Sequence, residues 1–232
     1  MNIDIKSIRR IELELRYPPT GDFVDKRGAL LKRLKKYWDF RSFKHDRVEC
    51  GNNDNSGTGI ITWKQSYINV EGEPNYGKYS DAIHNTFSRK LWDEINVEEF
   101  TYIRFSIYFL QEESELSYEE MNEKYSSLLN INDSTFDFIS MEHTDVGFLS
   151  NVFEDKNKKI TLTFGPTDIS QMKSRFFNYH EDLPENGHIQ KLNIEYKIPR
   201  ENRLMVILKE IKEFINKEFI PFINKVIEKI EV

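Results

Sequence analysis

The chain has 232 residues, of which 38% are hydrophobic and 31% charged, as in a folded globular protein rather than a disordered one. Its net charge of −6 argues against a protein that holds nucleic acid by broad phosphate neutralisation, although 33 lysines and arginines leave room for a local basic patch. The single cysteine, Cys50, excludes an internal disulfide and a multi-cysteine zinc site. One free thiol and no signal-like start favour a cytoplasmic protein, and no apolar run is long enough to predict a membrane helix.

The first half of the chain alternates between predicted strands and helices. Residues 8–17 place Ile11, Leu13, Leu15 and Tyr17 on one face and charged residues on the other, which predicts a half-buried strand. The further predicted elements are a helix over 23–38, strands over 40–49 and 59–71 joined by a turn at 51–57, a helix over 78–95 and a strand over 99–110.

The second half is predicted to be richer in strands. A helix over 117–129 begins with the capping-box pair Ser117 and Glu120. The further predictions are strands over 135–142, 147–153, 160–164 and 189–198, a hairpin turn at 154–158, and a short helix with a loop over 165–187. An apolar stripe from Leu204 to Ile230 predicts one long C-terminal helix, which Pro221 should bend near Ile220.

These elements predict a single α+β domain over residues 1–232, with a mixed or antiparallel sheet, helices on one side and a long C-terminal helix. Residues 11–18 and 192–199 share a strand–proline–helix pattern, which suggests two related halves, 1–115 and 116–232. About 30 aromatic residues should fill a large core and leave some for a recognition face.

Three elements, and the opening strand over 8–17 before its helix, carry a resemblance to a known family. The strand Leu192-Asn193-Ile194-Glu195 precedes a helix with Ile211, Ile215, Phe219 and Ile223 at regular spacing, and a central strand runs from Arg104 to Gln111. This pattern resembles a sporadically distributed family of uncharacterised bacterial and archaeal proteins of similar length. The chain departs from the family's polar pattern at Ser106, Tyr108, Gln111 and Asn193, and retains Arg104. The resemblance implies a fold, and its patchy distribution implies a prokaryotic accessory component, such as one of a defence or toxin–antitoxin system.

No known catalytic or cofactor motif occurs in the sequence, so we predict no cofactor and no metal. The histidines lack the spacing that places two imidazoles on one helix face around a metal ion, and Cys50 has no local base that would make it a nucleophile. An enzyme acting on nucleotides or nucleic acid would need a site assembled from distant residues. The candidates for such a catalytic site are Arg104, His143, Asp145 and His180.

The favoured function is therefore a non-enzymatic binding or interaction protein. The candidate binding residues are Lys32, Lys35 and Lys36 on the first helix and Tyr102, Arg104 and Tyr108 on one face of the central strand. Arg104 either pairs with a carboxylate on an adjacent strand or lines a groove for an anionic partner. A protein partner is favoured, a small ligand and a homodimer stay open, and nucleic acid is disfavoured by the net charge.

Overall fold

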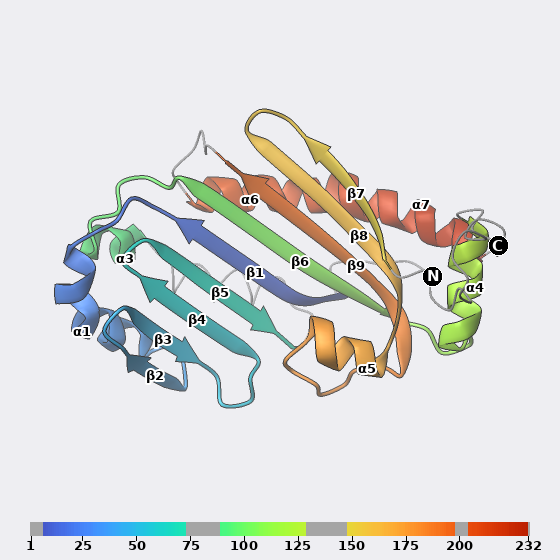
Figure 1. The fold of residues 1–232 in the computed structure, drawn as a ribbon, viewed down its shortest axis with the longest axis horizontal. Helices are drawn as coiled ribbons and strands as arrows, with labels where there is room; N and C mark the ends of the chain where they lie inside the picture. Colours follow the sequence, from blue (N-terminus) through green and yellow to red (C-terminus); the bar gives the residue numbers. More distant parts are fainter. Residues whose placement is uncertain (1–6, 73–88, 129–147, 198–203, 232) are drawn as a thin grey trace, which may run out of the picture.

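The computed structural model describes residues 7–72, 89–128, 148–197 and 204–231, and within them the predicted α+β class is confirmed. The strands form one antiparallel sheet in the order β2-β3-β4-β5-β1-β6-β9-β8-β7 (Figure 1). The strands are β1 (Ile8–Arg16), β2 (Phe40–Phe43), β3 (Arg47–Gly51), β4 (Gly57–Thr62), β5 (Gln65–Glu71), β6 (Tyr102–Glu112), β7 (Leu149–Glu154), β8 (Lys158–Asp168) and β9 (Asn186–Tyr196).

The helices lie mainly behind the sheet in Figure 1. They are α1 (Asp22–Leu34), α3 (Arg89–Glu94), α4 (Tyr118–Leu128) and a C-terminal rod of α6 (Leu204–Phe214), the π-helical turn η4 (Ile215–Phe219) and α7 (Ile220–Glu231). A further short segment, α5 (Ile169–Gln171) with the π-helical turn η3 (Met172–Phe176), lies instead at one end of the opposite face.

The strand order separates the chain into two sets of strands that meet at the centre of the sheet. β1 is followed by α1 and then by β2 to β5 on one side, while β6 is followed by α4 and then by β7 to β9 on the other. This arrangement relates β1 to β6, whereas the sequence echo links β1 to β9. Descent from two related halves stays a prediction.

The main core lies between the sheet and the helices. The apolar residues of β1 face this side together with Phe23, Leu30 and Leu34 of α1. The C-terminal rod buries a stripe along its length, and the ring of Phe219 lies 5.1 Å from that of Phe109 on β6. The buried residues of this stripe are Ile207, Ile211, Ile215, Phe219 and Ile223. Packing against the sheet therefore occupies the predicted apolar face of the helix.

A π-helical turn precedes Pro221 in the C-terminal helix, and the predicted bend near Ile220 stays a prediction. The π-helical turn η4 ends at Phe219, two residues before the proline. Proline has no N–H to donate and its ring crowds the preceding turn, so a widened turn accommodates it without ending the helix.

The prediction of two long strands over 40–49 and 59–71 is wrong, because each is split into a hairpin. The first hairpin closes where the Lys44 backbone N–H donates to the Arg47 carbonyl at 2.8 Å. In the second, Thr62 Oγ1 accepts from the Gln65 backbone N–H and donates to the Gln65 carbonyl, both at 3.0 Å. Neither turn contains the glycine or proline by which a turn is usually recognised.

Other local predictions are confirmed. Ser117 and Glu120 form the reciprocal capping box of α4, with bonds of 2.8 and 3.2 Å. Asp155 closes the β7–β8 turn by accepting from the backbone N–H groups of Asn157 and Lys158. The predicted strand over 135–142 and the start of the predicted helix over 78–95 lie outside the described residues.

Candidate functional site on the polar face of the sheet

The face of the sheet away from the core is lined by polar side chains in cross-strand rows. On β1 these are Arg10, Glu12, Glu14 and Arg16, which alternate with the core residues. The register sets Arg10 between Glu71 and Tyr108, Glu12 between Asn69 and Ser106, and Glu14 between Tyr67 and Arg104. Residues directly opposite each other on antiparallel strands have side chains close enough to interact. Glutamate, arginine and tyrosine side chains therefore lie next to one another along these rows.

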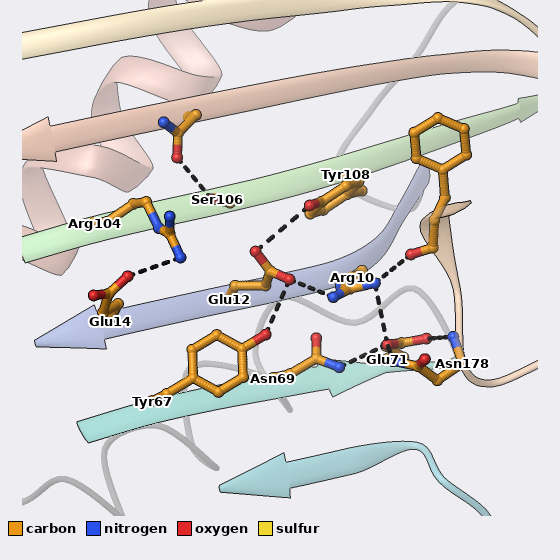
Figure 2. A network of polar contacts seen from close by, with 12 residues as sticks. Arg10, Glu12, Glu14, Tyr67, Asn69, Glu71, Arg104, Ser106, Tyr108 and Asn178 are labelled. Atoms are coloured by element: carbon orange, nitrogen blue, oxygen red, sulfur yellow. Dashed lines mark hydrogen bonds and ion pairs between the residues drawn. The ribbon is translucent and has the colours of Figure 1, made fainter. Parts of the chain in front are cut away.

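A network around Glu12 occupies the centre of this face (Figure 2). Arg10 forms an ion pair with Glu12, and its guanidinium lies 5.0 Å from the centre of the Tyr108 ring. The hydroxyls of Tyr67 and Tyr108 donate to the two oxygens of Glu12 at 3.0 and 3.5 Å. The acceptor sites of this carboxylate are thus used within the protein.

Glu71 joins this network to the segment that follows η3. Its carboxylate accepts from the side chain of Asn69 at 2.6 Å, from Asn178 through both backbone and side chain, and from the Tyr179 backbone N–H at 3.0 Å. Arg10 lies 3.6 Å from the same carboxylate and also donates to the Phe176 carbonyl. These contacts hold the end of η3 against the sheet, as Figure 2 shows.

The prediction that β1 is half-buried is wrong, because its polar face is largely covered as well. Glu12 and Glu14 are only 9% and 7% exposed. Burying a charge is costly unless it is paired and hydrogen-bonded, and the network satisfies this condition. Alternation along β1 identifies the two faces but carries no information on what covers them.

Burial and charge shift the titration of the network. Burial disfavours the charged form of Arg10, but Glu12 and Glu71 outweigh it and raise the pKa of the guanidinium. Burial and then Glu12 raise the pKa of Tyr108 to about 12, and the same two causes raise the pKa of Tyr67 further. Both phenols therefore stay protonated and serve as hydrogen-bond donors.

Beside this network is a hollow of about 230 Å³ that extends from β1 across β6 and β9 to β8. Its lining combines short side chains with the longer, charged ones of Glu12, Arg104 and Lys191. The residues that line it are Glu12, Arg104, Ser106, Thr161, Thr163, Lys191 and Asn193. We call this cavity the hollow.

Arg104 both forms the predicted structural pair and lines the hollow. Its Nη2 lies 2.8 Å from Oε2 of Glu14, directly opposite on β1. The side chain of Arg104 is nevertheless 37% exposed, whereas that of Glu14 is 9% exposed. The two interpretations of Arg104 that the sequence leaves open are therefore compatible.

Lys191 is the second cation of the hollow. Its ammonium lies 4.8 Å from the centre of the Tyr108 ring, and we find no ion pair or hydrogen bond from it to another residue of the described ranges. Burial lowers the pKa of Lys191; Glu12 opposes this shift, and Arg104 and Arg10 add to it. An ammonium in this position would be stabilised by an added acceptor.

The structure brings together only part of the predicted site. Tyr102, Arg104 and Tyr108 do share a face, and Tyr108 is buried within the network. Lys32, Lys35 and Lys36 are exposed on or just after α1, whose apolar residues pack into the core on the other side of the sheet.

Of the four catalytic candidates, only Arg104 and His180 lie in the described part of the chain, and these two are not brought together at the hollow. His180 Nε2 contacts the Phe177 carbonyl at 3.0 Å and does not line the hollow. His143 and Asp145 lie outside the described residues. Arg104 alone of this group is placed in the hollow.

Sequence reasoning missed most of the hollow, namely Glu12, Lys191, Asn193, Thr161 and Thr163. Each is a polar residue at an alternate position of a strand, which is a usable signal for a polar face. The signal does not say which strands become neighbours, so these residues could not be grouped in advance.

The thiol of Cys50, the one cysteine considered as a nucleophile, is buried in the main core. Burial raises the pKa of the Cys50 thiol to about 12, and its Sγ lies 3.6 Å from the Gly59 carbonyl. Among the residues that the structure describes, no group of three or more His, Cys, Asp or Glu side chains is arranged to hold a metal ion. That the fold needs no metal stays a prediction.

Comparison with known proteins assigns no family to this chain. No family model matches it, and no curated protein matches it. One solved structure with some likeness is described as Methanococcus jannaschii TBP, with 10% identity, coverage of 90% of this chain and 97% of that one, and a TM-score of 0.30. This likeness is too low to support an argument about function. In the described part of the chain no helix is both long and apolar enough to cross a membrane.

Proposed function

We propose that this protein is a non-enzymatic binding protein whose polar sheet face receives a partner protein at the hollow. The observation that carries the proposal is the contrast within this face. Glu12, Glu71 and Arg10 are locked by internal contacts, while Arg104 and Lys191 project beside a hollow with donors left over. A rigid polar surface with unused donors is suited to recognition, because little conformational entropy is lost on binding.

The chemistry of the hollow favours binding over catalysis. Among the residues that the structure describes, its lining includes no histidine or cysteine, and the one carboxylate there, that of Glu12, is occupied by Arg10 and two tyrosines. A general base must be free to accept a proton from a substrate within hydrogen-bond reach. The alternative, an enzyme acting on nucleotides or nucleic acid, has no specific observation in its favour.

The wider biological role rests on the family resemblance. A component of a prokaryotic accessory system, of the defence or toxin–antitoxin kind, is part of this proposal, as is a cytoplasmic location, which the free thiol supports. Homodimer formation also stays a prediction, which the concentration dependence of the mass in light scattering would test.

The proposal is tested by filling the hollow. Thr161→Tyr places a ring in it, whereas Thr58→Tyr makes the same change at an exposed position of β4 on the same face, about 24 Å away across five strand spacings. Wild type and both variants would be used to capture partners from host cells, and the affinity of the identified partner would then be measured with purified proteins.

We expect Thr161→Tyr to weaken binding at least tenfold and Thr58→Tyr to leave it unchanged, with similar melting temperatures for all three proteins. Wild-type affinity in Thr161→Tyr would exclude the hollow from the interface. Equal losses in both variants without a change in melting temperature would also contradict the proposal, since the hollow would then have no special part.

A further inference from the structure

We propose that the hollow recognises a carboxylate group, presented by an acidic side chain of a partner protein. This inference rests on the proposed function and specifies its chemistry. It rests on which hydrogen-bond donors and acceptors of the polar face already have partners within the protein.

Among the described residues, the buried carboxylates of this face, Glu12, Glu14 and Glu71, each accept from at least two partners, and the half-buried Glu195 accepts from at least one. Glu12 receives Arg10, Tyr67 and Tyr108, and Glu71 receives Asn69, Asn178, Tyr179 and Arg10. Glu14 receives Arg16 at 2.7 Å and Arg104 at 2.8 Å, and Glu195 receives the side chain of Asn193 at 2.7 Å. A cationic ligand would have to displace these internal donors.

The hydrogen-bond donors of the hollow, by contrast, are largely unused. Within the described ranges, Arg104 uses Nη2 for Glu14, and no partner is found for its other nitrogens. Lys191 has only the ring of Tyr108, and the hydroxyl of Thr161 has no partner among the same residues. Arg104 and Lys191 have no acceptor groups, so what the hollow lacks is an acceptor that carries negative charge.

The register explains why the two cations can act on one group. Lys191 lies in the cross-strand row of Tyr108, and Arg104 lies two rows away in the row of Glu14 and Glu195. Between them is the row of Glu12, Ser106, Asn193 and Thr161; the last three have short side chains, and Glu12, at the β1 end of the row, is already paired with Arg10. A small anion seated over this middle row would have a cation on each side.

A carboxylate fits this setting better than a phosphate. A carboxylate has one negative charge and about four lone-pair sites, so the free N–H and O–H groups of Arg104, Lys191 and Thr161 are enough to satisfy it from both sides of the hollow. Glu12 lines the hollow, and Glu14 and Glu195 lie opposite Arg104 on the neighbouring strands, so these carboxylates would repel a dianionic phosphate more strongly than a monoanion. The same carboxylates, and the net charge of −6, oppose a chain of phosphates.

The inference is tested with the N-acetylated α-amide of glutamate as the probe and that of glutamine as its neutral counterpart. Inorganic phosphate forms a third arm, and all titrations are made at equal ionic strength on the full chain. Binding is followed by the NMR shifts of Lys191 and of the neighbouring amides of β8 and β9. We expect saturable shifts with the glutamate probe and none with the glutamine probe.

Variants of Lys191 then test whether binding of the glutamate probe depends on this ammonium group. Lys191→Met should weaken binding of the glutamate probe about tenfold or more, the usual value of a charged hydrogen bond. Lys191→Arg should restore part of the affinity, and Lys217→Met, at a side chain 73% exposed on η4, should leave it unchanged. Lys191 has no ion pair to lose in the described structure, so the fold should tolerate its replacement.

The outcomes separate this inference from the proposed function. Equal shifts with the glutamate and glutamine probes, saturation by phosphate alone, or an unchanged affinity in Lys191→Met would each overturn the carboxylate assignment. If the carboxylate assignment failed in this way but Thr161→Tyr still lost the partner, the hollow would be the interface and only the proposed ligand chemistry would be wrong. If the glutamate probe bound in the hollow but Thr161→Tyr retained the partner, the carboxylate site would be confirmed and the proposed protein interface would be wrong.

Discussion

At the scale of single residues, the polar face depends on carboxylates that are buried and fully engaged. Glu71 is 4% exposed and accepts hydrogen bonds from two backbone N–H groups and two asparagine side chains. Such a group stabilises the fold only while every partner is present, because each partner has also been removed from water. Its removal would leave Arg10 and several donors unsatisfied at once.

We therefore expect Glu71→Ala to lower the free energy of unfolding by about 3–5 kcal/mol. The matched control is Glu49→Ala, which removes a more exposed carboxylate paired with Arg47 and Lys44 and should cost about 0–1 kcal/mol. Urea unfolding followed by fluorescence would measure both. Similar small losses in the two variants would contradict the role of Glu71 as the anchor of the segment after η3.

At the scale of elements, the C-terminal rod shows how an apolar stripe becomes core. Phe219 is 2% exposed and packs on Phe109, whereas Phe222, three residues further along, is 44% exposed. Both phenylalanines belong to the stripe that the sequence predicts, but a helix packed on a sheet buries only the central line of such a stripe. The rim of the stripe is left to solvent.

Phe219→Ala should lower the free energy of unfolding by about 3–5 kcal/mol, because it removes a buried ring and leaves a cavity against β6. Phe222→Ala makes the same chemical change on the same rod and should cost less than about 1 kcal/mol. Thermal and urea unfolding of the two variants would decide the point. Equal effects would mean that the rod is not packed on the sheet as described.

At the scale of the whole molecule, several carboxylates link stability to pH. The pKa is lowered at Glu49 and Glu154 by their lysine and arginine partners, and also at Glu113. At Glu113 burial acts to raise the pKa, but the backbone N–H groups of Glu115 and Leu116 and the ring of His188 outweigh it. Each of these groups contributes stability that is complete above its ordinary pKa of 4.5 and is lost as pH falls through its folded pKa.

The free energy of unfolding should therefore fall as the pH is lowered below 4.5. Glu113→Gln should be less stable than the wild type at neutral pH, and the difference should narrow as the wild-type carboxyl becomes protonated. Urea titrations at a series of pH values would measure this, with the exposed neighbour Glu115→Gln as control. A constant difference between wild type and Glu113→Gln across that range would refute the linkage.

The sequence alone determined those features that arise from neighbours along the chain. The two faces of β1, the capping box of α4, the turn at Asp155 and the buried stripe around Phe219 all follow from residue types at fixed spacing. The α+β class follows from the same periodicities. Each of these interactions joins residues only a few positions apart, or requires only that one face be apolar.

The tertiary structure alone decided the site. Glu14 meets Arg104 across 90 positions of the chain, and Ser106 meets Asn193 across 87, because β1, β6 and β9 happen to be neighbours in the sheet. Alternation shows that such residues share a polar face, but it has the same form whichever strands pair. Strand order is set by the packing of the whole core, so the hollow with Lys191 and Arg104 at its sides emerges only when the sheet is complete.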